Sequence, residues 1–329
     1  MSIRAYLENL ARRTGDAWNR FWFQPSDPLP LAILRIVVGT IALYLVGSFG
    51  FDLLRYFGPN GILSTSNVRA LLDVTDNEYR WSYLNYAGDT TTLWVMHGAG
   101  LAILAAFTVG LFTRITSVLS VIVFLAYVHR AWVLTDQAEP IVSMLLLYLS
   151  LGPSGEALSI DAWRKRRRAP HTPSASATYG ATVVLRLIQV HTALIYLMMF
   201  LGKQLATFVW WQGSAVWWLI ARPDTCLVDL RWMHEYPYLI SIWTTSIIWF
   251  EPAFAVLIWN PLVRPLLVFG SGLYWLSVAV LLGNVPFCAA MFASGLSFVG
   301  ASQWRGMCGG YCETGSPNVA VRKPAGSAA

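Results

Sequence analysis

The sequence predicts an all-α fold, a polytopic integral membrane bundle of about eight transmembrane helices that follows a helix lying on the membrane surface. Three observations lead to this prediction. Of the 329 residues, 56% are hydrophobic and only 12% are charged, whereas a soluble domain carries about 25% charged residues. The apolar residues are concentrated in runs whose lengths are close to the length needed to cross a bilayer, about 20 residues. The 16 Trp and 14 Tyr residues suit a protein with two interfaces between lipid and water.

Residues 1–28 are predicted to form an amphipathic cytoplasmic segment. Between residues 3 and 23, arginines and aromatic residues recur with helical spacing, and a helix of this composition is typical of the membrane surface. Pro25 and Pro28 end the helix. The segment is therefore expected to lead into the first span without crossing the bilayer itself.

The transmembrane domain is predicted to occupy residues 29–301. The polar segments 51–91 and 206–237 are predicted outer loops, residues 164–178 form a basic cytoplasmic linker, and residues 302–329 form a polar, disordered tail. Eight apolar runs are predicted as spans, and they cover residues 29–50, 92–112, 115–134, 138–152, 180–205, 238–259, 262–283 and 285–301.

The distribution of charge predicts the orientation. With the N-terminus in the cytoplasm, the arginine-rich first helix, the RKRRR cluster at 164–168, Arg264 and the basic residues of the tail all lie on the cytoplasmic side. Most acidic loop residues then lie outside, in agreement with the positive-inside rule. We therefore predict a multi-pass protein of the cell membrane with both termini cytoplasmic. Because topology accounts for the net charge of +6, no nucleic-acid partner is predicted.

The sequence lacks the motifs of several enzyme classes. It contains no nucleotide-binding loop, no HExxH, no Gly-x-Ser-x-Gly and no histidine-box cluster, which argues against an ATPase, a zinc protease, a serine hydrolase and a di-iron desaturase. Cys308 and Cys312 are a lone pair of thiols, whereas metal sites use three or four ligands. No metal site is predicted.

Polar side chains recur along one face of the fifth predicted span. Arg186, Gln189, Tyr196 and Lys203 share this face at 3.6 residues per turn. Ionisable groups within a span are costly and by default mark a functional site. The stripe is therefore expected to face the bundle interior or a water-filled cavity, and a structural hydrogen-bond network between helices is an equally open interpretation.

Glu251, in the sixth predicted span, is the clearest acid within an apolar run. A carboxylate there must pair with a base, for which Lys203 and Arg186 are the candidates, or stay protonated. Pro252 beside it permits a kink. A structural pair and a functional acid both remain open.

Three further charged residues lie near the ends of predicted spans. His129 and Arg130 are close to the outer end of the third span; a histidine can act as a base near neutral pH, and a structural pair at the wet rim is the alternative. Arg35 lies early in the first span. It can snorkel toward the cytoplasmic side or pair internally, and we expect it to snorkel.

Several segments, in order along the chain, resemble the horizontally transferred transmembrane domain (HTTM) family, the bacterial relatives of the vitamin K-dependent gamma-carboxylase. The resemblance covers about residues 20–300. The matching segments are LAILRIVVG, YFGPNGILS, GLFTRITSVL, His129-Arg130 with VLTDQAEP, LGPSGEALSIDAW, LRLIQVHTALIYLMMFLGKQL with WWQGSAVW, and FEPAFAVLIWNPLVRPLLVFGSGLYW.

The resemblance implies a lysine base that starts the oxygenation of a reduced quinone, followed by carboxylase and epoxidase chemistry. Lys203 lies nearest to the family lysine, but the family places that lysine directly before a leucine, where this chain has Gln204 before Leu205. His129 is similar to an outer-face histidine of the family. Tyr274 stands where many relatives have a histidine.

Two functions follow as hypotheses. The first is an enzyme whose cavity opens to the outer face and is lined by the polar stripe, Glu251 and His129, with a lipid-soluble cosubstrate from the bilayer and Lys203 or His129 as base. Arg130 and Gln204 complete the predicted binding residues. The second is a non-catalytic partner in the maturation of, or immunity to, a secreted peptide, similar to the membrane protein that helps mature the sporulation-delaying toxin.

Overall fold

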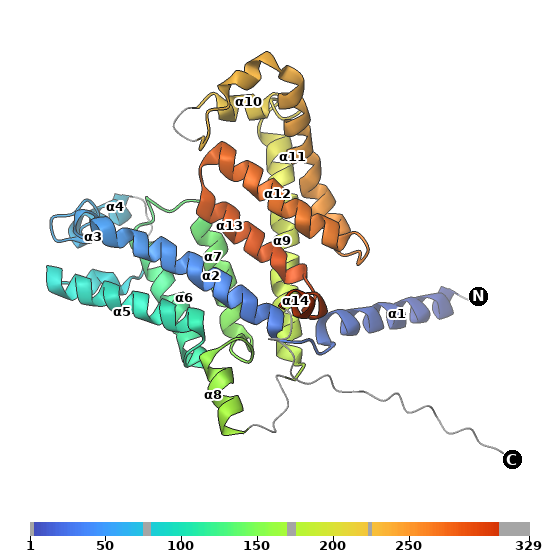
Figure 1. The fold of residues 1–329 in the computed structure, drawn as a ribbon, viewed down its shortest axis with the longest axis horizontal. Helices are drawn as coiled ribbons and strands as arrows, with labels where there is room; N and C mark the ends of the chain where they lie inside the picture. The colour runs from blue at the N-terminus through green and yellow to red at the C-terminus, as the bar shows by residue number, and fades with distance from the viewer. Residues whose placement is uncertain (1–2, 75–79, 170–175, 223–225, 309–329) are drawn as a thin grey trace.

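The computed structural model describes residues 3–74, 80–169, 176–222 and 226–308, and within these ranges the chain is all-helical (Figure 1). The described residues form no strand, and one isolated bridge joins Ser26 to Thr178. The all-α fold class is therefore confirmed.

A helix stands at each of the eight predicted spans. Their bounds are α2 Leu29–Ser48, α5 Thr90–Val109, α6 Thr113–Arg130, α7 Ala138–Leu151, α9 Tyr179–Ala206, α11 Pro237–Leu257, α12 Arg264–Leu282 and α13 Val285–Gly295. Five helices among the described residues are long and apolar enough to cross a membrane: α2 with its extension to Phe57, α5, α9, α11 and α12. A sixth is added if α13 and the following helix, bent by 110°, count as one span. Helix α7 has only 14 residues.

The segments outside the spans contain more helix than predicted. Loop 51–91 holds α3, α4 and η2, loop 206–237 holds α10 and η3, and the basic linker begins inside α8, which Ser159 caps by accepting a hydrogen bond from the Ala162 amide at 2.9 Å. The short elements are η1 Phe49–Asp52, α3 Leu53–Phe57, α4 Thr65–Val74, η2 Tyr83–Tyr86, α8 Ile160–Arg168, α10 Ala215–Ile220, η3 Arg231–Glu235 and η4 Leu296–Phe298.

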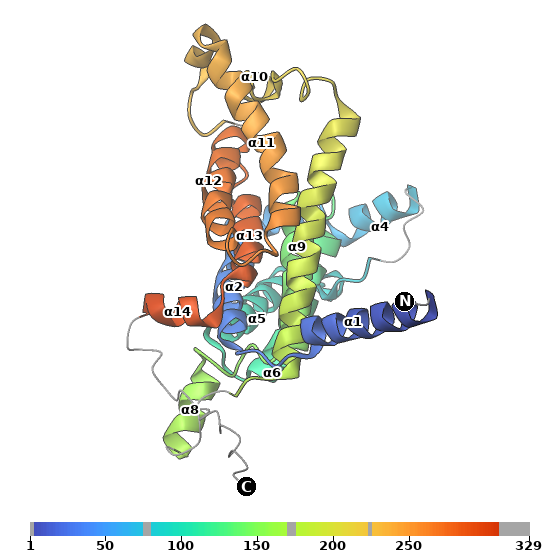
Figure 2. The same cartoon turned by 90° about the vertical axis from the view of Figure 1, so that its right-hand side faces the viewer.

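The structure describes a helix at the predicted N-terminal segment but only the first part of the predicted C-terminal tail. Helix α1, Ile3–Phe23, matches the predicted surface helix and projects sideways from the bundle (Figures 1 and 2). The predicted C-terminal tail begins inside α14, Ala301–Cys308. The rest of that tail, 309–329, lies outside the described residues, as do positions 170–175 of the basic linker.

Two hydrophobic cores organise the bundle. One is built mainly from α2, α5, α6 and α7, and the other from α9 to α13. Leu45 of α2 and Ile141 of α7 pack against both cores, so the cores are continuous. Helix α9 packs most extensively against α11, and α2 against α5.

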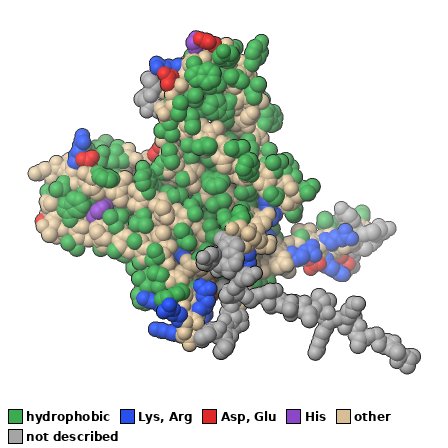
Figure 3. Space-filling model, in the orientation of Figure 1, with side chains coloured by type: hydrophobic (Ala, Val, Ile, Leu, Met, Phe, Trp, Pro, Cys, Tyr) green, Lys and Arg blue, Asp and Glu red, His purple; other side chains and the backbone are tan. Residues whose placement is uncertain are grey.

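The exterior of the bundle is apolar. Large exposed side chains on α9, α11 and α12 include Leu194, Met198, Ile242, Trp249, Leu266 and Phe269. Lysine and arginine side chains gather instead at the end that carries α8 and along α1 (Figure 3). This arrangement is compatible with a membrane protein, because lipid-facing positions need no polar cover.

Arg35 holds the turn between α7 and α8 in place. Its side chain is 0% exposed and donates hydrogen bonds to the carbonyl oxygens of Ser154 and Leu158, both at 2.5 Å. The expectation that Arg35 snorkels to the aqueous side is wrong. The turn folds over α2 and its backbone carbonyls replace water around the guanidinium group, which a sequence pattern does not reveal.

Asp161 fixes the start of α6 from the other side of this turn. Its carboxylate accepts hydrogen bonds from the amides of Phe112 at 3.0 Å and Thr113 at 2.7 Å, and from the Thr113 hydroxyl at 2.9 Å. Partial burial acts to raise the pKa of Asp161, but these hydrogen bonds outweigh it, so the pKa is lowered.

Gly110 should be intolerant of a side chain, because it ends α5 at φ +74° and an added Cβ would lie 2.4 Å from the Ser159 Cβ and 2.9 Å from the Arg35 Cζ. We expect Gly110→Ala to destabilise the purified protein by about 2–4 kcal/mol, from left-handed strain plus crowding. Gly98→Ala in the same helix meets no atom within 4 Å and should be neutral. Thermal unfolding followed by tryptophan fluorescence measures both, and equal stability of the two variants would contradict the prediction.

The Asp161 contacts predict a pH-dependent stability. Because the folded-state pKa is below the unfolded value of about 3.9, the stabilisation is present above that value and is lost as pH falls through the folded-state pKa. Asp161→Asn should therefore be less stable than wild type at pH 7, and the difference should shrink below about pH 4. Unfolding temperatures of both proteins between pH 7 and pH 3 test this, and a constant difference over that range counts against it.

Candidate functional site

A buried ion pair joins α9 to α11. Lys203 of α9 forms a salt bridge through its Nζ with Oε1 of Glu251 in α11, where the carboxylate is 0% exposed and the lysine side chain 18%. Of the two bases considered for Glu251, Lys203 is therefore the partner. A lysine near a helix end can snorkel, but here its long stem turns to the carboxylate.

Tyr274 of α12 completes a three-residue cluster, which we call the acid–base triad (Lys203, Glu251 and Tyr274). Its hydroxyl donates to the same Oε1 at 2.5 Å, and its ring stacks on Phe250 with centroids 4.9 Å apart. The second carboxylate oxygen, Oε2, is buried and has no partner among the described residues. Oε1 thus accepts hydrogen bonds from both Lys203 and Tyr274, while Oε2 is still able to accept hydrogen bonds from another group.

Aromatic side chains surround the triad. Tyr196, predicted to line a cavity, is fully buried, stacks on Phe254 at 4.1 Å and accepts a hydrogen bond from Trp275 Nε1 at 2.6 Å. Its ring lies 6.2 Å from that of Tyr274. Tyr196 is therefore part of the apolar wall, and the low polarity of this wall strengthens electrostatic interactions inside it.

The exposed side of Lys203 faces the segment that follows α9. Its Nζ lies 5.3 Å from the centre of the Trp210 ring, within cation–π range. Both polar atoms of the neighbouring Gln204 side chain are buried without a partner in the part of the chain that is described. The lysine amine, the Gln204 amide and Glu251 Oε2 thus supply unfilled hydrogen-bonding capacity near the end of α9.

Arg186 and Gln189 share the face of Lys203 but lie far from it along α9. Seventeen residues separate Arg186 from Lys203, about 25 Å at 1.5 Å per residue. Arg186 donates to Gln189 Oε1 at 2.8 Å, and Gln189 donates to the Ser297 carbonyl oxygen at 2.7 Å. The stripe predicted on α9 therefore separates into two groups at different depths.

His129 and Arg130 lie apart from both groups on α9. His129 Nδ1 donates to the Trp81 carbonyl oxygen at 2.9 Å, and buried Arg130 donates to Asn85 Oδ1 at 2.5 Å and Thr65 Oγ1 at 3.2 Å. These partners come from the 65–85 segment and none comes from α9, α11 or α12. The structure does not bring His129 together with Lys203 and Glu251, because α6 ends in the other core.

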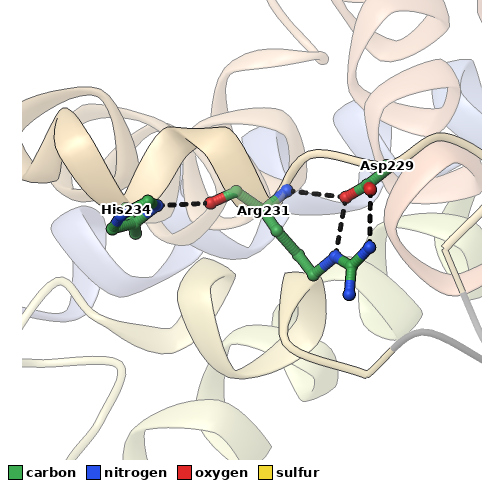
Figure 4. Close-up of polar contacts among 3 residues, drawn as sticks. All are labelled: Asp229, Arg231 and His234. Carbon is green, nitrogen blue, oxygen red and sulfur yellow. Dashed lines mark hydrogen bonds and ion pairs between the residues drawn. The ribbon is translucent and has the colours of Figure 1, made fainter.

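Figure 4 shows a polar network that the sequence did not suggest. Arg231 donates to both carboxylate oxygens of Asp229, at 2.9 and 2.7 Å, and these contacts lower the pKa of Asp229 to about 2. His234 Nδ1 donates to the Arg231 carbonyl oxygen at 2.9 Å. All three side chains are exposed, so the network stabilises a surface turn, and the Asp-x-Arg spacing is its only signal in the sequence.

The described residues hold no cluster of three or more His, Cys, Asp or Glu side chains that could bind a metal, and the thiol pair at 308–312 extends outside them. Two pockets, of about 540 and 210 Å³, lie around the N-terminal part of α9, and neither is lined by Lys203, Glu251 or His129. These pockets do not fit a quinone placed against Lys203.

Comparisons of the chain with protein families, with curated proteins and with solved structures found no match. The HTTM resemblance, and the roles it implies for Lys203, Gln204 and His129, therefore stay predictions.

Proposed function

We propose that this chain is an acid–base enzyme of the cell membrane that acts on a lipid-soluble substrate through the acid–base triad. The observation that carries the proposal is the fully buried Glu251 carboxylate. One of its oxygens accepts from both Lys203 and Tyr274, and the other has no partner among the described residues. A purely structural pair is expected to satisfy both oxygens.

The membrane placement is part of the proposal. It comprises about eight spans, α1 on the inner surface and both termini in the cytoplasm. Five long apolar helices, the apolar exterior and the gathering of basic side chains on α8 and α1 support it. The shorter helices α6, α7 and α13 complete the eight proposed spans.

The triad can supply a base. Transfer of a proton from Lys203 Nζ to Glu251 Oε1 would give a neutral amine and a neutral acid, which removes two charges from the apolar surroundings. The amine can then accept a proton from a weakly acidic substrate, which becomes the anion. Tyr274 donates to Oε1 in the starting ion pair. The substrate would approach along the exposed side of Lys203, beside Trp210.

The resemblance to the HTTM family, which stays a prediction, extends the proposal to reaction class. In that extension Lys203 is the base of a carboxylase- or epoxidase-like enzyme. Gln204 is the alternative for the family position. Its side-chain amide has no partner in the described part of the chain, which suits a role in binding substrate.

Charge-removing variants separate catalysis from structural support. Lys203→Met alone leaves Glu251 buried and unpaired and should cost about 3–5 kcal/mol, lowering membrane abundance. The double variant Lys203→Met/Glu251→Leu removes both charges and should restore abundance. If the triad is catalytic, the double variant reaches wild-type abundance but fails to produce the metabolite and lipid changes caused by wild-type expression, as measured by mass spectrometry of cell extracts.

The matched control is Arg231→Gln, which removes one partner of an exposed ion pair that is not part of the triad. This variant should retain both wild-type abundance and the wild-type product. Wild-type products from an abundant double variant would contradict catalysis and leave the pair as a link between α9 and α11.

The second candidate function, a non-catalytic partner of a secreted peptide, is favoured by the exposed aromatic side chains of the 206–238 segment. They are Phe208, Trp211, Trp218, Trp232, Tyr236 and Tyr238. Apolar rings displayed on a proposed outer surface can bind a peptide. An unchanged metabolite profile on wild-type expression, together with loss of peptide maturation in Trp218→Ser, would favour this function over the enzyme.

A further inference from the structure

A polar pocket of about 210 Å³ lies at the opposite end of α9 from the triad. It is formed by the connection between α1 and α2, the N-terminal half of α9, the start of α12 and residues 297–301. Its polar lining includes Gln24, Asp27, Arg186, Gln189, Arg264 and Ser297. The inference drawn from it uses the membrane placement proposed above and is independent of the acid–base chemistry.

Two arginines in this pocket have no carboxylate partner among the described residues. Arg186 donates to the Phe21 carbonyl oxygen and to Gln189, and Arg264 donates to the carbonyl oxygens of Ile258 and Trp259. The two positive charges are close enough to act unfavourably on each other. Each guanidinium is thus fixed in place by neutral groups, and the positive charge of the pair is left unbalanced.

The acid in the lining does not balance this charge. Asp27 forms a salt bridge with Arg305 of α14 through Oδ2, and its Oδ1 accepts from the Leu29 amide at 2.9 Å. Its charge is therefore already matched by an arginine outside the pair. The pocket as a whole keeps the excess positive charge of Arg186 and Arg264.

Hydrogen-bond donors remain available in the pocket. Arg186 Nη2 and Arg264 Nη1 have no hydrogen-bond partner in the described part of the chain. Ser297, which is 2% exposed, also has a buried hydroxyl without a partner there. Two guanidinium donors and a hydroxyl around one cavity match the oxygen atoms of a phosphate group, which arginine recognises well through its planar set of N–H groups.

The surroundings indicate where such a phosphate comes from. Arg186 stacks over the Phe21 ring at 4.4 Å, and Phe21 contacts the Trp259 ring at 5.7 Å, so an aromatic layer of the kind found at membrane interfaces lies beside the pocket. Leu262 and Leu266, which flank Arg264 in the chain, are exposed and apolar. A ligand held here therefore has apolar surface next to its charged group, as an acyl chain requires.

We propose that this pocket binds the phosphate of an anionic phospholipid headgroup on the cytoplasmic side of the membrane. Arg186 and Arg264 contact the phosphate oxygens, Ser297 donates a further hydrogen bond, and Asp27 with Arg305 closes the polar rim. Bound lipid would then hold α1, α9 and α12 together at this end of the bundle.

The test measures lipid retention by the full-length protein in detergent, using native mass spectrometry with phosphatidylglycerol and phosphatidylcholine as probes. Wild type should retain phosphatidylglycerol preferentially and unfold at a higher temperature in its presence. Arg186→Gln and Arg264→Gln should each weaken this binding about ten- to a hundredfold. Arg186→Lys and Arg264→Lys keep the positive charge and should weaken this binding less.

Arg166→Gln is the matched control, because it removes one positive charge from the exposed helix α8 without touching the pocket, and it should bind as wild type does. The proposal is overturned if Arg166→Gln weakens binding as much as the pocket variants, or if the pocket variants bind as wild type does. It is also overturned if soluble glycerol 3-phosphate displaces the lipid at equal concentration, since the site would then recognise free phosphate. None of these readouts depends on the acid–base triad.

Discussion

The structure depends on one constraint: charged side chains that are buried among apolar helices must find their partners inside the chain, because their apolar surroundings offer none. The chain meets this constraint in three ways. Arg35 uses backbone carbonyls of a turn, Arg130 uses a side-chain amide and a hydroxyl, and Lys203 uses the carboxylate of Glu251. Each solution ties a long helix to a segment distant in sequence, so the placement of charge also fixes how the helices and turns are arranged.

Helix α9 connects the two ends of the molecule. Its 28 residues extend about 42 Å. This is longer than the hydrocarbon core of a bilayer, which is about 30 Å thick. In the proposed membrane placement its two ends therefore reach both interfaces. Arg186 lies near one end and Lys203 near the other. The same helical face therefore carries an excess of positive charge at one depth and a neutralised ion pair at the other, and these two environments suit different ligands.

Much of this arrangement could be predicted from the sequence, and the limits have physical causes. Apolar runs and helical spacing located every long helix, the surface helix α1 and the face that carries Arg186 and Lys203. Sequence spacing does not fix how helices pair, so Glu251 was left with two candidate bases and His129 was placed with it in one cavity. Tyr274 was singled out only as a departure from a family pattern, because the sequence does not indicate which group a tyrosine hydroxyl in an apolar helix will bind. Arg35 was misjudged because its partners are carbonyls, which every residue carries.

Unfilled hydrogen-bonding capacity distinguishes the triad from the other buried charges. Among the described residues, Nε is the buried nitrogen of Arg35 and of Arg130 that has no partner, and an arginine has four other N–H donors. Glu251 leaves one of its two oxygens unfilled, and a carboxylate concentrates its charge on those two atoms. A buried acceptor without a donor costs about 1–3 kcal/mol, although adding a hydroxyl nearby would remove that cost. The bundle places a tyrosine and a lysine at the first oxygen, while no described residue donates to the second. The second oxygen is therefore still able to accept a hydrogen bond, and the proposed function rests on this feature.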